Sequence, residues 1–514
     1  MTRIRTLGYL LDEALRLVPE REALLQDDLT LTFSDLDRRC DQVASWVRDA
    51  GVRPQQRVAL LWSNDVRYVE AMLGTIRAEA VAVPLNVKLG DDALGYVLED
   101  AEAVGILAHP DLADRARQLG AATGRSLWTA TPPDWLQAEP RFPRADTDPD
   151  AICFQPYTSG STGRPKGVLL SHRGQVWNAD VMRRWEMIDE TERALVSAPV
   201  YHKNAGMTLK IFLIGGASVV VRPGFDPVET IAAIERYRCT YIGGVPAMFR
   251  RLLEAEDALR NHDVSSLRFA TAGSADVPAD LLAAFEARFG VPIGNGYGLT
   301  EGGPDVLISP RYGIRKLGSI GPPIPGCKVR LTDPADPGRE VAVGETGELW
   351  TKNPGVTQGY HNLPELSRER IRDGWLATGD LMRRDADDYY YFVGRKDDLL
   401  NVGGENVYPK EVEAILRQHP AVADVAVVGV AHPVKGQAPV AAVVEREPGG
   451  LSGAELTAFF VQRGPAYAHP RRTLFVAALP LGATGKVDYA AVRRLFADPA
   501  PGQGGPGSDP GDGG

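Results

Sequence analysis

The residues most able to bind an anion lie in one short stretch, Tyr157 to Val168, which is rich in hydroxyl groups and glycines. Hydroxyl groups donate hydrogen bonds, glycines allow backbone N–H groups to approach an anion closely, and a lysine adds a positive charge. These residue types together predict a phosphate-binding loop. Its predicted binding residues are Thr158, Ser159, Gly160, Ser161, Thr162, Gly163 and Lys166.

This loop differs from the Walker P-loop, in which lysine directly follows the last glycine and Ser or Thr comes next. Here two residues separate Gly163 from Lys166, and another glycine follows the lysine. Apolar, strand-like segments at 152–157 and 168–170 flank the loop, so we expect it to join two extended segments instead of opening a helix. A flexible Ser/Gly linker is the alternative, but linkers rarely carry lysine between proline and glycine inside a hydrophobic frame.

Other parts of the chain must position this loop. The chain is expected to form more than one domain, because 514 residues exceed what one hydrophobic core usually fills. Strand-like and helical runs alternate from 57 to 84 and from 218 to 297, which is typical of parallel βαβ layers. A helix is also expected over the amphipathic run from Leu36 to Val47, which follows Ser34. After Gly318, short strand-like pieces between Gly/Pro turns predict a small β-rich subdomain.

The expected fold therefore combines the α/β and α+β classes. We place a large N-terminal domain, made of mainly parallel βαβ layers and the small β-rich subdomain, at 1–396. A small α+β C-terminal domain is expected at 397–497, because charged residues at 394–398 interrupt the apolar pattern. Seven glycines and four prolines in 498–514 leave little to bury, which predicts a disordered tail.

Charge and cysteine content limit the classes of function. The net charge of −10 and the pI near 5.5 argue against a nucleic-acid partner and against an anionic membrane. Four widely spaced cysteines without metal-type pairing fit reduced thiols. No long apolar run is visible, and Asp12 and Glu13 stand where a signal peptide would be apolar. The sequence thus predicts a soluble cytoplasmic enzyme without membrane insertion, and it does not indicate an oligomeric state.

Residues 157–168 resemble the phosphate-binding signature of the adenylate-forming (AMP-binding) superfamily, and further motifs follow in family order up to about Phe496. The superfamily includes acyl- and aryl-CoA synthetases, peptide-synthetase adenylation domains, luciferases and amide bond synthetases. In it, the loop holds the β- and γ-phosphates of ATP. Residues 295–301 resemble its adenine and magnesium motif. The roles implied are Tyr297-Gly298 at the adenine, with the tyrosine stacked on it, Thr300 at the α-phosphate and Glu301 as the Mg²⁺ ligand.

Further residues acquire expected roles from the same resemblance. Asp380, in Thr-Gly-Asp, matches the ribose-binding motif. Arg395 matches a nucleotide contact, and Asp397 matches the hinge about which a mobile C-terminal domain rotates. Lys486 matches the lysine that reaches the reacting carboxylate and the α-phosphate. His202 lies where the family places its acyl pocket, with either a direct catalytic role or a packing role.

The resemblance implies that ATP and Mg²⁺ activate a carboxylic acid. The acid attacks the α-phosphate, an acyl-adenylate forms and pyrophosphate leaves, while cationic groups offset the repulsion between the two anions. CoA is the expected acceptor, which gives a thioester. A free amine, which gives an amide, is the alternative, and a carrier protein is a further one. From another class, a non-catalytic nucleotide-binding regulator is disfavoured because Lys486, Glu301 and Asp380 are all present.

Some positions depart from the family pattern or bear on the substrate. Residues 467–470 read Tyr-Ala-His-Pro, with alanine where CoA-using members commonly have lysine. Arginine also binds phosphate, so three nearby arginines can replace that lysine: Arg463, Arg471 and Arg472. Lys203 stands where amino-acid-activating members have Asp, which disfavours an α-amino acid. Small residues near the family's acyl pocket favour an aryl or bulky acid, and these are Gly244, Gly302 and Gly303. The segment 345–360 also matches the family and is interpreted as structural.

Overall fold

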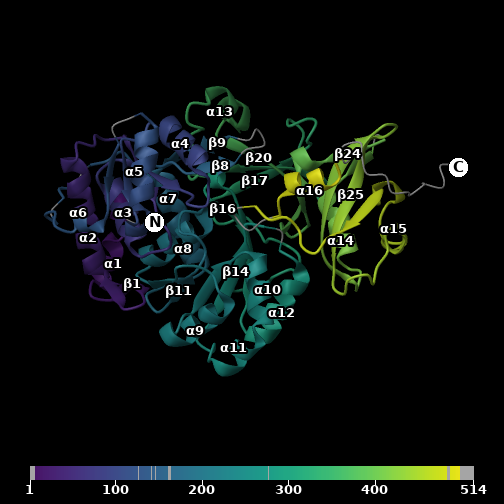
Figure 1. Ribbon diagram of the computed structural model, residues 1–514, viewed down its shortest axis with the longest axis horizontal. Helices are drawn as coiled ribbons and strands as arrows, with labels where there is room; N and C mark the ends of the chain where they lie inside the picture. Colours follow the sequence, from purple (N-terminus) through teal and green to yellow (C-terminus); the bar gives the residue numbers. More distant parts are fainter. Residues whose placement is uncertain are drawn as a thin grey trace. The chain divides into compact units, whose positions relative to one another are not determined.

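The computed structural model describes residues 6–124, 127–140, 142–144, 146–159, 164–275, 277–403, 405–482 and 487–497. The chain forms two compact units, the first ending at Phe392 and the second beginning at Val393 (Figure 1). The domain boundary predicted between 396 and 397 stays a prediction. The predicted tail, 498–514, lies outside the described residues.

Among the described residues, the largest sheet of the first unit has eight strands in the order β16-β15-β14-β13-β11-β12-β1-β2. Its inner pairs are parallel because strands alternate with helices along the chain, while β1/β2 and β15/β16 are antiparallel. The strands are β1 (Glu22–Gln26), β2 (Leu29–Thr32), β11 (Arg193–Val196), β12 (Ser218–Val221), β13 (Tyr241–Gly244), β14 (Phe269–Gly273), β15 (Ile293–Gly298) and β16 (Asp305–Ile308).

A second sheet of the first unit has six strands in the order β10-β7-β4-β3-β5-β6. Its pairs are parallel except β7/β10. The strands are β3 (Arg57–Leu61), β4 (Val81–Leu85), β5 (Gly105–Ala108), β6 (Trp128–Ala130), β7 (Ile152–Phe154) and β10 (Leu170–Ser171). The two sheets confirm the predicted parallel βαβ layers.

Helices cover these sheets through apolar stripes. The helices of the first unit are α1 (Asp12–Leu17), α2 (Phe33–Asp49), α3 (Arg67–Arg77), α4 (Asp91–Asp100), α5 (Ala113–Ala122), α6 (Pro132–Trp135), α7 (His172–Trp185), α8 (Lys203–Ile214), α9 (Pro227–Tyr237), α10 (Pro246–Glu254), α11 (Glu256–Asn261), α12 (Ala279–Phe289) and α13 (Pro364–Arg370), with the short 3₁₀ turns η1 (Leu7–Tyr9), η2 (Pro110–Leu112) and η3 (Thr300–Gly302). Helices α2 and α3 bury Val43 and Leu73 in the largest core cluster. Helices α9 to α12 gather beside β14 (Figure 1), where Phe249 and Phe285 pack edge to face.

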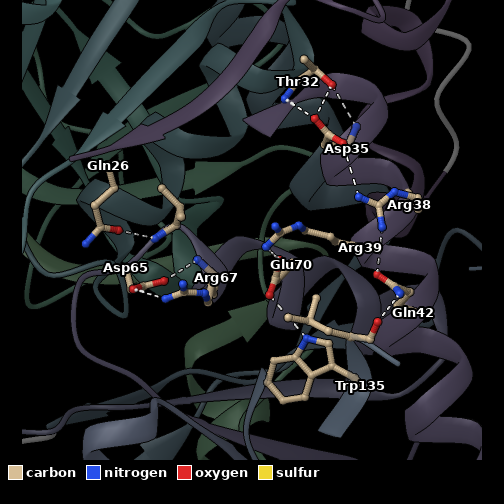
Figure 2. Close-up of polar contacts among 12 residues, drawn as sticks. Gln26, Thr32, Asp35, Arg38, Arg39, Gln42, Asp65, Arg67, Glu70 and Trp135 are labelled. Atoms are coloured by element: carbon tan, nitrogen blue, oxygen red, sulfur yellow. Dashed lines mark hydrogen bonds and ion pairs between the residues drawn. The ribbon is translucent and has the colours of Figure 1, made fainter. Parts of the chain in front are cut away.

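Helix α2 begins earlier than the sequence suggested, at Phe33 instead of after Ser34. Its N-cap is Thr32, whose Oγ1 accepts a hydrogen bond from the Asp35 N–H at 3.0 Å (Figure 2). Asp35 Oδ2 in turn accepts from the Thr32 N–H at 3.2 Å. This reciprocal capping box satisfies two donors at the helix end, which is why the helix starts there.

A buried carboxylate joins α2, α3 and α6 inside the first unit (Figure 2). Glu70 is fully buried, and its Oε2 accepts from Arg39 Nη1 at 3.3 Å. Its Oε1 accepts from Trp135 Nε1 at 3.4 Å. Burial raises the pKa of Glu70, and the two donors favour its charged form. Because both carboxylate oxygens are held by neighbouring helices, we interpret this cluster as structural.

The first unit also contains the predicted β-rich part and a separate hairpin. The β-rich sheet is antiparallel in the order β17-β18-β20-β19, and β21 also pairs with β20. Its strands are β17 (Lys328–Thr332), β18 (Thr346–Lys352), β19 (Ile371–Arg372), β20 (Trp375–Arg384) and β21 (Tyr390–Arg395), and the last residues of β21, from Val393 on, belong to the second unit. The hairpin consists of β8 (Tyr157–Ser159) and β9 (Pro165–Gly167). Pro156 separates β7 from β8, so the strand-like run 152–157 is divided between two sheets.

The second unit is the predicted compact α+β structure. Its sheet has the order β23-β22-β25-β24, with β26 parallel to β25. Its elements are η4 (Lys396–Asp398), β22 (Leu400–Val402), β23 (Glu405–Val407), α14 (Pro409–Leu416), β24 (Val422–His432), β25 (Gly436–Glu445), α15 (Gly453–Val461), η5 (Ala466–Ala468), β26 (Arg472–Phe475) and α16 (Tyr489–Leu495). Leu416 and Phe460 belong to one apolar cluster of this unit, and Val492 belongs to another. The predicted fold class is thereby confirmed.

All four cysteines are free thiols, and burial raises the pKa of each. This fits the reduced state expected from their spacing. Within the described ranges, no helix has the length and apolar character needed to cross a membrane.

Candidate active site

The predicted phosphate-binding loop connects the two strands of the small hairpin, where Thr158 lies opposite Lys166. Extended segments therefore flank the loop, as predicted. The Tyr157 hydroxyl anchors the hairpin by donating to Asp100 Oδ2 at 2.6 Å, and burial raises the pKa of this tyrosine. Ser159 is the last residue of β8. The predicted ligands outside the described residues are Gly160, Ser161, Thr162 and Gly163.

Glu301 lies beside this hairpin, in the short turn η3 that follows β15. Thr158 Oγ1 donates to Glu301 Oε1 at 3.1 Å. The Tyr360 hydroxyl donates to the same oxygen at 3.4 Å. Two hydroxyls from distant parts of the chain therefore orient one carboxylate next to the predicted phosphate loop.

The segment that ends at Tyr360 also fixes the backbone around Glu301. The Thr357 N–H donates to the Glu301 carbonyl at 2.8 Å, and Asn353 Nδ2 donates to the Gly302 carbonyl at 2.9 Å. This segment, interpreted from the sequence as structural, thus places a hydroxyl on a predicted site carboxylate. A resemblance over a whole segment does not show which of its side chains reach a site.

Tyr297 and Asp380 come from different sheets and make direct contact, since the Tyr297 hydroxyl donates to Asp380 Oδ2. Asp380 lies in β20 and is 5% exposed. Its N–H donates to Thr378 Oγ1 at 3.1 Å, and the Gly379 N–H donates to Glu348 Oε1 at 3.2 Å. The predicted adenine-binding and ribose-binding side chains are therefore adjacent, and the backbone beneath the aspartate is hydrogen-bonded.

The turn from Gly298 to Pro304 is tightly packed. A Cβ atom at position 298 would lie 1.8 Å from the Pro304 carbonyl oxygen, so only glycine fits there. Gly303 has φ +129°, a backbone conformation that other residues rarely adopt. A Cβ atom at Gly355 would lie 2.5 Å from the Gly303 carbonyl oxygen. This packing fixes Thr300 and its neighbours relative to β15.

A pocket with about 660 Å³ of empty space, part of it open to solvent, lies along β14, β15 and β16. Helices α7 and α8 supply other residues of its lining. Phe212, Tyr241 and Phe269 give it aromatic walls, with ring centroids 5.0 Å and 4.7 Å apart in the two successive pairs. A concave aromatic pocket beside β15 suits a small organic ligand.

The glycines that line this pocket differ from those expected. Gly273 and Gly296 line it, whereas the lining within the described chain does not include Gly244, Gly302 or Gly303. A Cβ atom at Gly302 would clash with the Leu299 side chain, and one at Gly303 with Asn353. These two glycines therefore allow close packing of the turn and open no room for a substrate.

Three charged side chains line it, of which only Lys203 was related to the substrate from the sequence: Glu186, Lys203 and Asp305. Burial raises the pKa of Asp305, and Lys203 and Lys210 counteract this. Burial raises the pKa of Glu186 to about 8. Lys203, noted from the sequence only as a departure from amino-acid-activating members, donates to the Pro304 carbonyl at 3.4 Å. Isolated acidic residues in a sequence carry no pattern, so no sequence signal indicated that Glu186 and Asp305 line a pocket.

His202 is the N-cap residue of α8, and its ring packs 4.7 Å from the ring of Tyr201. Asn64 holds the loop that leads to this pair, because its Nδ2 donates to the Ala198 carbonyl at 2.8 Å and its Oδ1 accepts from the Val200 N–H at 2.9 Å. Asn64 was not predicted. Its position just after a buried parallel strand is a signal that could have found it, since sites form at the carboxyl ends of such strands.

The remaining predicted site residues belong to the second unit. Arg395 ends β21 and is exposed, and Asp397 lies in the turn η4. Burial raises the pKa of the neighbouring Asp398, and Arg395 counteracts this. Lys486 lies outside the described residues.

Ala468, which stands where CoA-using members have lysine, is buried at 4% exposure in the core of the second unit. The three nearby arginines have different neighbours. Arg471 Nη1 lies 2.5 Å from His469 Nε2, Arg472 Nη1 donates to the Phe496 carbonyl at 3.4 Å, and the Arg463 guanidinium stacks 3.7 Å from the Phe459 ring centroid.

These features define the class of protein. A mainly parallel sheet carries, beside its carboxyl edge, a phosphate-type hairpin, an oriented carboxylate and a tyrosine–aspartate pair, next to an aromatic pocket, as expected for an adenylate-forming enzyme. The chain belongs to the AMP-binding enzyme family, whose model matches residues 11–361, and the model of the family's C-terminal domain matches residues 411–486.

Known proteins similar to this chain include ligases with different acyl acceptors. A feruloyl-CoA synthase from Amycolatopsis sp. is 38% identical over 491 residues, which cover 94% of this chain and 97% of the relative. The structure of the anthranilate CoA ligase AuaEII in complex with anthranoyl-AMP has a TM-score of 0.88 and 29% identity, with 95% of this chain and 97% of that chain covered. The amide bond synthetase McbA from Marinactinospora thermotolerans has a TM-score of 0.87 and 26% identity, with 96% and 100% covered.

The family match and these relatives confirm the predicted superfamily and the predicted enzyme class, an ATP-dependent, AMP-forming ligase of the acyl-CoA synthetase type. Within the described residues, no group of three or more His, Cys, Asp or Glu side chains could hold a metal ion. The roles of individual site residues stay predictions.

Proposed function

We propose that this enzyme uses ATP and Mg²⁺ to convert an aryl carboxylic acid to its acyl-adenylate and then transfers the acyl group to CoA. One observation carries the proposal. Three predicted nucleotide motifs, whose contacting residues lie 143 and 83 positions apart in sequence, converge through the Thr158–Glu301 and Tyr297–Asp380 contacts. Such a convergence is what a single ATP molecule, with its phosphates, ribose and base, would require.

In this proposal the first unit binds ATP. The hairpin loop with Lys166 binds the β- and γ-phosphates, and Thr300 binds the α-phosphate. Asp380 accepts hydrogen bonds from the ribose hydroxyls, and the Tyr297 ring stacks on the adenine. The Tyr297 hydroxyl bond to Asp380 would couple the two positions, so that ribose and base are oriented together. From the second unit, Arg395 is assigned a contact to the nucleotide.

Glu301 fits the role of a magnesium ligand. Both of its hydroxyl donors bind Oε1, and Oε2 has no hydrogen-bond partner within the part of the chain that the structure describes. One carboxylate oxygen is thus available beside the phosphate loop. Because Mg²⁺ is commonly held by one or two carboxylates plus substrate phosphates, a larger acidic cluster is not needed. Bound there, Mg²⁺ would neutralise phosphate charge.

The carboxylate oxygen of the acid attacks the α-phosphorus, a P–O bond to pyrophosphate breaks, and pyrophosphate leaves. We assign Lys486 to the charge that develops in this step and Asp397 to the pivot that withdraws the lysine afterwards. His202 directly precedes Lys203, which lines the pocket that we assign to the acid, and we assign His202 to the acyl-transfer side of the reaction. Feruloyl-CoA synthase and anthranilate CoA ligase, by their names, act on aryl acids, which supports an aryl acid here.

The similar proteins differ in the acceptor of the acyl group. CoA is favoured by the feruloyl-CoA synthase relative, which shares 38% of its aligned residues with this chain. A free amine is the second candidate, favoured by the similarity to an amide bond synthetase and by Ala468 in place of the expected lysine. The cytoplasm, predicted from the sequence, is the compartment that we propose for either reaction.

Pyrophosphate release from ATP and Mg²⁺, measured with a panel of aryl and alkyl acids, tests the proposal. We expect release that depends on an aryl acid and that Glu301→Gln lowers by about 10-fold or more, since a charged ligand is lost. ATP binding without acid-dependent release would instead indicate a non-catalytic nucleotide-binding protein.

A further inference from the structure

We propose that Glu186 is a specificity-determining residue, which selects aromatic acids carrying a hydroxyl or amino group at the end of the ring remote from the carboxylate. The inference rests on the proposed function, because it takes the pocket along β14 and β15 as the site of the acid. It adds the chemical class of the substrate and the side chain that recognises it.

The direction of the pocket follows from the register of its strands. Gly273 pairs with Gly296 near the carboxyl ends of β14 and β15, next to the turn that holds Glu301. Phe269 and Tyr241 pair with each other at the amino end of β14. From Phe269 to Gly273 the extended strand spans about 13 Å. A substrate whose carboxylate reacts near Glu301 would therefore point its far end toward Phe269.

Glu186 lies at this far end. Its carbonyl accepts from Arg311 Nη1 at 3.0 Å, and the Arg311 guanidinium stacks 3.8 Å from the Phe269 ring centroid. Glu186 is 6% exposed and lines the pocket. A carboxyl group this deeply buried is costly unless something forms hydrogen bonds with it.

The neighbouring protein groups do not satisfy this carboxyl. The other terminal nitrogen of Arg311 donates to Glu192 Oε1 at 2.9 Å. The Glu186 carboxyl has no hydrogen-bond or ion-pair partner in the ranges that the structure describes. Two lysines, Lys203 and Lys210, stabilise the charge of Asp305, the second carboxyl of the pocket. Among the described residues, Arg311 is the one cation that lowers the pKa of Glu186, and its terminal nitrogens already bond the Glu186 carbonyl and Glu192 Oε1. Glu186 is therefore the pocket carboxyl that a ligand would complete.

The chemistry of the group selects the partner. Because burial raises the pKa of Glu186 to about 8, its carboxyl is mostly protonated at neutral pH and can both donate and accept. A phenolic hydroxyl or an aromatic amine offers the matching donor and acceptor. The aromatic walls formed by Phe212, Tyr241 and Phe269 suit the ring that carries it.

A matched pair of acids tests the proposal: 4-hydroxycinnamic acid and 4-methylcinnamic acid, which differ by a hydroxyl against a methyl group of similar size. The ratio of their kcat/KM values in pyrophosphate release should favour the hydroxylated acid by about 10- to 100-fold in the unmodified enzyme. Glu186→Met should bring this ratio to within about 3-fold, because the partner of the hydroxyl is lost. Glu186→Gln, which keeps a donor and an acceptor, should retain a preference of about 10-fold.

Glu192→Gln is the control. It removes the buried carboxylate that pairs with the same arginine, but Glu192 does not line the pocket. Glu192→Gln should leave the kcat/KM ratio of the two acids as in the unmodified enzyme. A purely structural role for Glu186 would give Glu186→Met and Glu192→Gln the same ratio.

Glu186→Leu replaces Glu186→Met as the apolar variant if Glu186→Met does not fold. Equal kcat/KM values for the two acids in the unmodified enzyme, or an unchanged ratio in the apolar variant, would overturn the inference. Absence of pyrophosphate release with every acid would instead overturn the proposed function.

Discussion

At the scale of single residues, side chains from the hairpin, η3, β15, β20 and the segment that ends at Tyr360 hold one another in place. Thr158 and Tyr360 orient Glu301, and Tyr297 contacts Asp380. Pre-formed contacts reduce the ordering that substrate binding must cost. We assign the cation for the α-phosphate to Lys486, which lies outside the described residues.

Lys486→Ala should lower acid-dependent ATP–pyrophosphate exchange by about 10² or more, because a charge is lost at the developing transition state. Supplied with ready-made acyl-adenylate, the variant should still form the final product, since the lysine is expected to act only in the first half-reaction. Both half-reactions are measured separately. An equal loss in both half-reactions would contradict the proposal that the lysine acts only in the first and is then withdrawn.

Glu186 should also make stability depend on pH. Its pKa is about 8 in the folded chain against an ordinary value of 4.5, with Arg311, Asp305 and Tyr241 as its charged or titratable neighbours. Between these values the folded state binds more protons than the unfolded state, so this contribution to stability is complete below 4.5 and is lost as the pH rises through 8. Glutamine does not titrate. The Tm of Glu186→Gln minus that of the unmodified enzyme should rise from pH 5 to pH 9, and a constant difference would contradict the assignment.

At the scale of elements, the turn between β15 and β16 is where packing most constrains the chemistry. Gly298→Ala would place a Cβ atom 1.8 Å from the Pro304 carbonyl oxygen, so the turn must move. We expect the KM for ATP to rise and pyrophosphate exchange to fall by about 10-fold or more. Gly296→Ala is the matched control, because its Cβ atom would lie 3.5 Å from the nearest side-chain atoms. It lines the pocket and should change the KM for the acid more than that for ATP; equal effects of both variants on ATP would exclude this role of the turn.

The turn η4 carries the expected pivot. Asp397→Pro would fix φ near −65° and restrict Lys396, which should hinder rotation. Acyl-adenylate should then form and accumulate while product formation slows, as rapid-quench analysis can measure. Product formation from adenylate at the normal rate would take Asp397 out of this role.

At the scale of the whole molecule, the sequence predicted the layers, the loop between extended segments and the family because each has a strong local signal. Alternating strands and helices indicate parallel sheets, and hydroxyl and glycine spacing indicates the loop. The sequence did not predict the pocket. Glu186 follows α7, Lys203 begins α8 and Asp305 begins β16, so their meeting depends on packing over long stretches of chain. The three glycines expected near a substrate pocket, Gly244, Gly302 and Gly303, do not belong to its lining within the described residues, and close backbone packing favours glycine as much as an open pocket does.

The identity of the acyl acceptor most directly tests the proposal that this enzyme is a CoA ligase. The enzyme is incubated with ATP, Mg²⁺, 4-hydroxycinnamic acid, CoA and a simple primary amine together, and products are followed by mass spectrometry. We expect the CoA thioester to form first and faster, and changing Arg471 and Arg472 to alanine to slow it, since these arginines are proposed to replace the lysine missing at Ala468. Rapid amide formation at low amine concentration, with no detectable thioester, would contradict the proposal that this enzyme is a CoA ligase.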